Sequence, residues 1–133
     1  MARWTSKSVN VGPTFFAGEI RGHQLYGDVP MPLGGHDLAM IPPEGLLVVL
    51  GNCLGMEIAL ACKNKGVDYM GMSIEVEAEW DEKEHFLHDF TLKVNMPADL
   101  DARAQRTVEA GVKMCTIRNT LMRGAQVDLT VTH

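Results

Sequence analysis

The feature that most constrains this chain is one long apolar run from Pro42 to Gly66, PPEGLLVVLGNCLGMEIALACKNKG. Two prolines begin the run, and a missing amide donor costs nothing in the first turn of a helix. Glu44 follows in that turn, where the helix dipole favours a carboxylate. Lysines and then Gly66 end the run, as is typical of a helix C-terminus. The run therefore predicts a single long helix over residues 42–65.

Composition indicates an ordinary one-domain protein. The chain has 133 residues, of which 46% are hydrophobic, so it can bury a real core. Its formal net charge of -5 argues against nucleic-acid binding, which usually needs a basic face. The first ten residues lack the apolar stretch of a signal peptide, and Asn52 and Glu57 interrupt the long run too early for a good membrane span. We therefore expect one soluble, cytoplasmic domain over residues 1–133, with neither a nucleic-acid nor a membrane partner.

The segments before and after the predicted helix have patterns that are mainly typical of β-strands. Residues 4–28 hold two β-prone runs with a turn signal at Gly12-Pro13, which predicts a hairpin, and residues 27–43 predict a loop rich in Pro and Gly. Residues 69–80 and 86–96 alternate between apolar and polar, which predicts a second antiparallel hairpin. On its second strand, Phe86 and His88 are expected on the same face as Phe90.

Residues 97–115 and 116–124 predict two further helices, and Asp99 is the expected N-cap of the first of them. Residues 125–133, AQVDLTVTH, predict a last strand. Because the strands come in hairpins and do not alternate with helices, the expected fold class is α+β.

The three cysteines are too few for a secreted disulfide framework. Cys53 lies between Gly51 and Gly55, and such glycines indicate that another stretch of backbone or a ligand comes close. Cys62 lies nine residues later on the opposite face, so it cannot bridge to Cys53 within one helix. Cys115 lies at a junction of two predicted helices, so Cys53–Cys115 is the pair expected if any disulfide forms. A cysteine among Leu and Val is often a small hydrophobe, so packing and chemistry both stay open.

The sequences around Cys53 and Cys115 resemble those of a known family. Residues 34–66, GGHDLAMIPPEGLLVVLGNCLGMEIALACKNKG, resemble the central segment of the OsmC/Ohr family, with Pro-Pro-Glu, a leucine-rich turn, Gly and Cys53 in matching places. Residues 115–124, CTIRNTLMRG, resemble the second family signature, with Thr116 where the family carries proline. The resemblance runs from about Tyr26 to the end and is closer to a less characterised OsmC-like branch.

The resemblance implies an intertwined homodimer with long central helices packed across it and two sites at the subunit interface. It also implies thiol-dependent reduction of organic hydroperoxides in oxidative stress defence, with no metal or other cofactor. Cys53 would attack the peroxide, Cys115 would resolve the product as a disulfide, and an external thiol would reduce the pair. The peroxidase branches also use a Glu and an Arg; Glu44 matches the Glu, but the loop over 28–42 has no Arg, so Arg21 is the nearest candidate.

Two other interpretations stay open at this point. In the first, a non-catalytic dimer of the same fold binds an apolar small molecule in its interface cavity, and the cysteines only pack. The missing loop arginine favours that interpretation. In the second, the cysteine pair is a thiol redox sensor that forms a disulfide without turnover.

Overall fold

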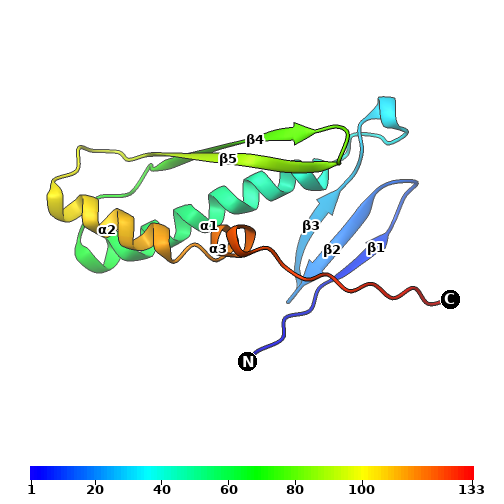
Figure 1. The fold of residues 1–133 in the computed structure, drawn as a ribbon, viewed down its shortest axis with the longest axis horizontal. Helices are drawn as coiled ribbons and strands as arrows, with labels where there is room; N and C mark the ends of the chain where they lie inside the picture. Colours follow the sequence, from blue (N-terminus) through cyan, green and yellow to red (C-terminus); the bar gives the residue numbers. More distant parts are fainter. The chain divides into compact units, whose positions relative to one another are not determined.

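The computed structural model describes all residues from Met1 to His133 and confirms the α+β class. The chain forms three α-helices, a three-stranded antiparallel sheet and a two-stranded antiparallel sheet (Figure 1). It divides into two compact units, residues 1–46 and residues 47–133. The prediction of a single domain stays a prediction.

The first unit contains a sheet with strand order β1-β2-β3. Its strands are β1 (Lys7–Asn10), β2 (Phe16–Ile20) and β3 (His23–Gly27), and a short 3-10 helix, η1 (Met31–Leu33), interrupts the predicted loop. The turn at Gly12-Pro13 lies between β1 and β2, as predicted. A second turn at Arg21-Gly22 makes three strands where the sequence predicted a hairpin. Both turn residues have positive φ, 52° and 81°, and only glycine adopts this without cost.

Helix α1 (Pro42–Lys65) has the predicted bounds. Gly66, with φ 69°, ends it, and the amide of Val67 donates to the carbonyl of Cys62 at 2.9 Å to close the last turn. One side of α1 faces the core of the second unit through residues that recur every four positions: Leu50, Leu54, Ile58 and Cys62, all at most 2% exposed.

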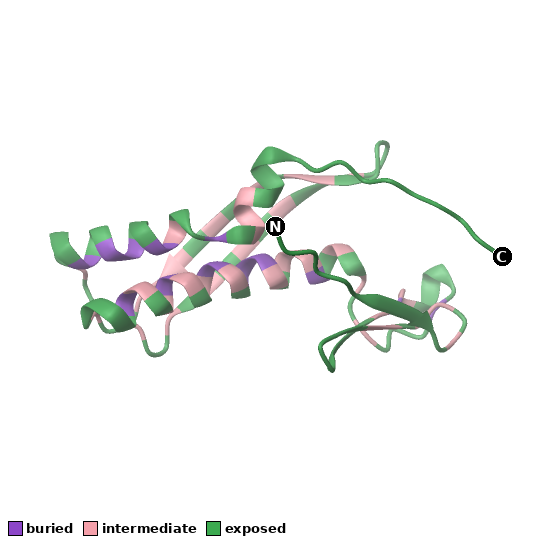
Figure 2. Cartoon of the chain, turned by 90° about the horizontal axis from the view of Figure 1, so that it is seen from below, coloured by how far each residue is buried: buried purple, intermediate pink, exposed green.

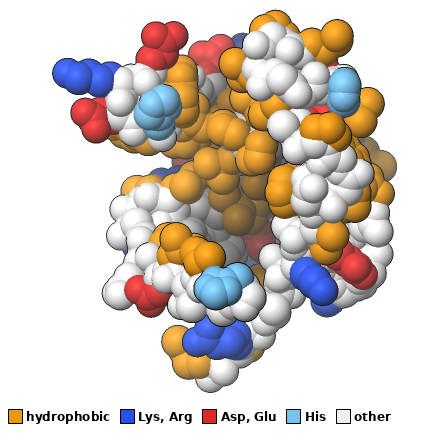
Figure 3. Space-filling model, turned by 90° about the vertical axis from the view of Figure 1, so that its right-hand side faces the viewer, with side chains coloured by type: hydrophobic (Ala, Val, Ile, Leu, Met, Phe, Trp, Pro, Cys, Tyr) orange, Lys and Arg blue, Asp and Glu red, His pale blue; other side chains and the backbone are white.

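Helix α1 is apolar on its outer sides as well. By length and composition alone it could cross a membrane, yet core helices of soluble proteins pass the same test. Only 28% of its most apolar window is buried, so much of its apolar surface is uncovered in the single chain. Exposed hydrophobic side chains are a prominent part of the molecular surface (Figure 3).

The core of the second unit lies between helices and a hairpin. Strands β4 (Ser73–Asp81) and β5 (Phe86–Asn95) cover one side of α1 and of α2 (Ala102–Lys113), and α3 (Thr116–Arg123) follows α2. Side chains of the hairpin, among them Ile74, Val76 and Leu92, pack against the buried line of α1. Figure 2 shows the buried residues where α1 and α2 face each other.

A β-bulge corrects the predicted face of β5. Val76 pairs with Leu92, but the register shifts beyond Glu77, so Trp80 pairs with Leu87. Asp89 occupies the irregular position with φ 52°. Because an extra residue flips the alternation, Leu87 takes the place that Phe86 or His88 would have had, and the prediction for those two residues is wrong.

Two predictions near the C-terminus are also wrong. The N-cap of α2 is Asp101, whose carboxylate accepts from the amide of Ala104 at 2.8 Å, and not Asp99. Residues 125–133 form no strand, although their pattern alternates. Val127, Leu129 and Val131 are 79–86% exposed, because no neighbouring strand in this chain pairs with the tail.

Gly111 allows α2 to cross α1 at very close range. A Cβ atom at this position would lie 2.7 Å from the Cα atom of Ile58 and 2.9 Å from the carbonyl oxygen of Glu57. Both are backbone atoms, so they could move only with the helix itself. Any side chain here would therefore push the two helices apart.

We expect Gly111→Ala to lower the free energy of unfolding by about 1–3 kcal/mol, as overpacked cores do. Gly45→Ala is the matched control: Gly45 is also helical, but its new Cβ would meet only the flexible Met40 side chain at 3.6 Å. That change should raise the free energy by about 0.5–1 kcal/mol through helix propensity. Urea unfolding at one fixed protein concentration measures both, and a Gly111→Ala protein as stable as the parent would contradict the close crossing.

Candidate functional site

Cys53 and Cys115 lie side by side in the second unit. Cys53 is on α1 and partly exposed, whereas Cys115 is the N-cap residue of α3 and 0% exposed. Cys53 packs against the buried cluster that contains Cys115, and the two thiols are near enough for Cys53 to affect the pKa of Cys115. Both are free thiols, as is Cys62. The structure therefore brings the two predicted cysteines together, while their chemical roles stay predictions.

The surroundings of Cys115 favour its neutral form. Burial raises the pKa of the Cys115 thiol, and the neighbouring Cys53 raises it further through a hydrogen bond and charge repulsion. The amides of Arg118 and Ile117, at the start of α3, lower the pKa of Cys115 in part. Cys115 is therefore a protonated thiol at neutral pH.

Cys62 does not belong to the pair. It is 0% exposed on the buried line of α1, and burial raises the pKa of its thiol. It packs in the hydrophobic core with Ile58 and Val108. Its surroundings are those of a small hydrophobic residue.

The other two predicted site residues lie in the first unit. Arg21 is exposed in the turn between β2 and β3. The Glu44 carboxylate accepts a hydrogen bond from the amide of Ile41 at 3.0 Å and so stabilises the first turn of α1. Neither side chain has an ion-pair partner. The structure gives both residues local roles, and their action on a thiolate stays a prediction.

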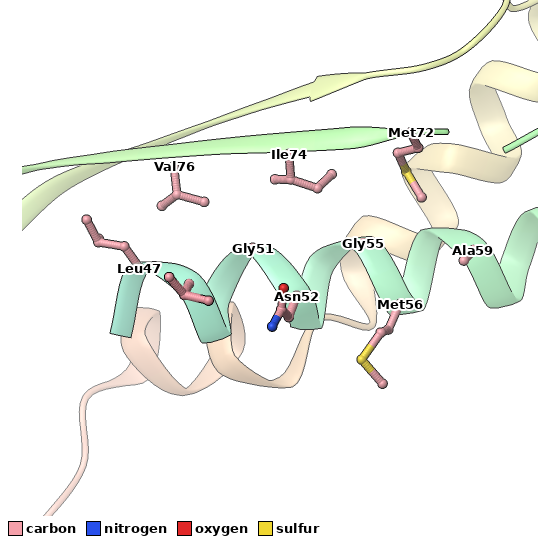
Figure 4. A pocket seen from close by; sticks show the side chains of 10 residues that line it. Leu47, Gly51, Asn52, Gly55, Met56, Ala59, Met72, Ile74 and Val76 are labelled. Carbon is pink, nitrogen blue, oxygen red and sulfur yellow. The ribbon is translucent and has the colours of Figure 1, made fainter. Parts of the chain in front are cut away.

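A groove of about 590 Å³ runs between α1 and β4 in the second unit (Figure 4). Gly51 and Gly55 lie on the side of α1 that faces Ile74 and Val76, and a Cβ at Gly51 would come within 3.3 Å of Val76. These glycines let β4 approach α1, which answers a question that the sequence left open. The lining is mainly apolar: Leu47, Val48, Gly51, Asn52, Gly55, Met56, Ala59, Met72, Ile74 and Val76.

The second unit therefore presents two adjacent thiols, Cys53 and Cys115, and a mainly apolar groove. No three His, Cys, Asp or Glu side chains lie close enough together to hold a metal ion. Two adjacent thiols of different exposure can be oxidised to a disulfide and reduced again, which needs no further group from the chain.

Asp28 is an organising residue that sequence reasoning missed. Its carboxylate is 2% exposed and accepts four hydrogen bonds, from the Thr14 hydroxyl at 2.6 Å and from the amides of Val29 at 2.8 Å, Leu38 at 3.1 Å and His36 at 3.3 Å. The Thr14 bond and the three amides lower the pKa of Asp28 from 3.8 to about 2, against the opposing effect of burial. An Asp at the start of a loop rich in Pro and Gly is a turn signal that could have indicated it.

We expect Asp28→Asn to destabilise the protein at pH 7 and to flatten its acid response. Because folding lowers the pKa of Asp28, its ionised form contributes stability that is present above pH 3.8 and is lost as pH falls towards 2. The difference in free energy of unfolding between parent and variant should therefore narrow between pH 4 and pH 2. Urea unfolding at several pH values measures it.

Asp37→Asn is the matched control for that experiment. Asp37 lies in the same loop, is exposed and has φ 53°, which asparagine also tolerates. Its variant should follow the pH dependence of the parent. A parent–Asp28→Asn difference that stays constant from pH 4 to pH 2 would contradict the role of the Asp28 carboxylate.

The chain matches one protein family, and its fold is similar to that of several solved structures. The family described as OsmC-like protein matches residues 34–130. The fold is similar to a Psychrobacter arcticus protein, provisionally described as an osmotic stress induced and detoxification response protein, at 17% identity and TM-score 0.77, covering 90% of this chain and 89% of that one. It is also similar to an OsmC-like protein from Mycoplasma pneumoniae, at 16% identity and TM-score 0.73, covering 91% and 88%.

A third solved structure with this fold is the organic hydroperoxide resistance protein OhrB of Bacillus subtilis. It is 21% identical, with TM-score 0.56, covering 88% of this chain and 90% of that one. Among curated proteins, no sequence matches this chain. At these identities the solved structures establish the fold alone.

Proposed function

Since the chain belongs to the OsmC-like protein family, as its sequence predicted, we propose that it is a thiol peroxidase that reduces organic hydroperoxides in oxidative stress defence. The observation that carries the proposal is the contact between the partly exposed Cys53 thiol and the buried Cys115 thiol. The name of the Bacillus subtilis protein with this fold supports the substrate class.

The proposed reaction begins at Cys53, because only this member of the pair is open to solvent. Its thiolate attacks the outer oxygen of R–OOH, the O–O bond breaks, and the alkoxide leaves as ROH after taking a proton. Cys53 is then a sulfenic acid. The Cys115 sulfur attacks the Cys53 sulfur, a disulfide forms, and the hydroxyl group leaves as water with the proton of Cys115. Two molecules of an external thiol reduce the disulfide and are themselves joined as a disulfide.

The surroundings of Cys115 suit the second step. A neutral, buried thiol does not compete for the peroxide, and it lies next to the sulfur on which the sulfenic acid forms. Fast capture of the sulfenic acid also protects Cys53 against irreversible oxidation to the sulfinic acid.

We expect reduced protein to lose two hydrogens within seconds of mixing with equimolar cumene hydroperoxide, and more slowly with hydrogen peroxide. Intact and peptide mass spectra should assign the loss to a Cys53–Cys115 disulfide. Cys53→Ser should abolish peroxide consumption, and Cys115→Ser should accumulate sulfenic and sulfinic acid at Cys53. Cys62→Ser is the matched control and should form the disulfide at the parent rate.

Arg21 and Glu44 are proposed as the groups that activate Cys53. If Arg21, paired with Glu44, stabilises the thiolate of Cys53, Arg21→Gln should slow oxidation of Cys53 by roughly tenfold or more at pH 7 and less at high pH, where the thiolate forms unaided. Lys7→Gln, on the neighbouring strand β1, is the matched control. Stopped-flow measurement of the oxidation rate against pH tests this, and an unchanged pH profile would exclude Arg21.

We also propose that the protein is a homodimer in which a second copy covers the outer side of α1. Val48, Met56 and Leu60 on that side are 46%, 66% and 56% exposed. A soluble protein rarely leaves so many neighbouring apolar side chains in water. Members of the family are soluble proteins, which favours a partner chain over a lipid bilayer as the cover, and the cytoplasm is the proposed compartment.

Met56→Glu should shift the protein from dimer to monomer, because a buried unpaired carboxylate at the contact costs several kcal/mol. Met114→Glu is the matched control: Met114 is 63% exposed at the end of α2, and its change should leave the dimer intact. Light scattering coupled to size-exclusion chromatography measures the mass. A monomeric parent, or equal effects of both changes, would contradict the proposal.

The second candidate function is an apolar-ligand binder with packing cysteines. It is favoured by the groove of about 590 Å³, a volume typical of small-molecule sites. In the peroxide experiment, this candidate predicts unchanged mass with all three thiols intact. A thiol sensor instead predicts a Cys53–Cys115 disulfide with no sustained peroxide loss when reductant is supplied.

A further inference from the structure

A second cleft lies between the C-terminal half of α1 and the helix α2, within the second unit. Its volume is about 380 Å³, and three of its lining side chains are cationic: Lys65, Arg103 and Arg106. Asn64, the buried Thr107 and two alanines complete the lining. No acidic side chain belongs to it.

The positive charge of this cleft is unusual for a chain with a formal net charge of -5. The Lys93–Glu75 ion pair and the His88–Asp89 hydrogen bond both lie on the β4–β5 hairpin, and none of the three cations of the cleft forms an ion pair. Glu109, one turn beyond Arg106 on α2, accepts a hydrogen bond from Gln105 at 3.2 Å and does not line the cleft. Three unpaired cations around one concavity raise the local concentration of anions.

The backbone of both helices fixes part of this cluster. A guanidinium nitrogen of Arg103 donates to the carbonyl of Lys65 at 2.6 Å, at the C-terminal end of α1. This bond uses one of the five N–H donors of Arg103 and leaves four for a ligand. The Thr107 hydroxyl donates to the Arg103 carbonyl at 3.1 Å, which orders the same turn.

Arg106 has no such structural explanation. It follows Arg103 by three positions, so both side chains project from one face of α2. Its exposed side chain makes no hydrogen bond or ion pair within the chain. A bound anion would relieve the repulsion among these charges.

We propose that this cleft binds the phosphate group of a small phosphate ester. Three cations are balanced better by a phosphomonoester, with about -1.5 to -2 charge at pH 7, than by a single carboxylate. The planar donors of arginine match phosphate oxygens in pairs. The cleft, at about 380 Å³, has the size of a small-molecule site and leaves space beyond a bare phosphate ion.

The site is separate from the thiols. Lys65 follows Cys53 by twelve positions on α1, which is about 18 Å along the helix axis. The proposal therefore does not rest on the peroxidase function. A bound phosphate ester should leave the disulfide formation of Cys53 and Cys115 unchanged.

Isothermal titration of the reduced full-length protein with glycerol 3-phosphate tests the proposal, at constant ionic strength set with sodium chloride. We expect saturable binding that Arg106→Gln weakens at least tenfold, because this change removes a cation that makes no bond within the fold. Lys113→Gln is the matched control, since it removes the same charge from the same helix outside the cleft, and it should bind as the parent does. Circular dichroism checks the fold of each variant, and Lys65→Gln replaces Arg106→Gln if the latter unfolds.

A parallel titration with inorganic phosphate distinguishes a phosphate ester from the free phosphate ion as the ligand. Tighter binding of glycerol 3-phosphate supports an ester as the ligand, and equal affinity supports the free ion in the same cleft. No saturable heat with either probe would overturn the proposal. Equal weakening by Arg106→Gln and Lys113→Gln would also overturn it, because it would show attraction by net charge without a site.

Discussion

The close packing of other elements against α1 is the constraint on which the second unit depends. At Gly111, α2 approaches the α1 backbone so closely that a single Cβ would overlap it, and at Gly51 the strand β4 lies within contact of the helix. These approaches place Cys115, which follows α2 directly, beside Cys53 on α1. The thiol pair is therefore a product of helix packing, since the two residues are 62 positions apart in the sequence.

Much of the fold could be predicted because its signals are local. The prolines, Glu44 and Gly66 defined both ends of α1, and alternation defined β4 and β5. The β-bulge at Asp89 could not be predicted, because an inserted residue leaves no mark in an alternating pattern until the partner strand is known. The tail over 125–133 has the pattern of a strand, but a strand needs neighbouring hydrogen bonds that local pattern cannot provide.

Of the candidate site, the sequence indicated the residues that lie in local motifs, but it could not indicate which residues tertiary packing brings together. Cys53 and Cys115 were recognised from the motifs around them, and their contact then followed from tertiary packing. The four donors to Asp28 come from Thr14 and from a loop, so only the folded chain brings them together. The cationic cleft combines residues of two helices, Lys65 and Arg106, that are 41 positions apart, and no spacing in the sequence joins them.

The burial of Cys62 makes it an internal reporter of how the protein opens. Its sulfur is 0% exposed in the core, so a thiol reagent can reach it only when α1 separates from the elements packed on it. At low reagent concentration the labelling rate of Cys62 then measures the population of that open state, and at high concentration it measures the rate of opening. Cys62, a third cysteine outside the proposed Cys53–Cys115 pair, is thus a natural probe for native-state exchange experiments that needs no added label.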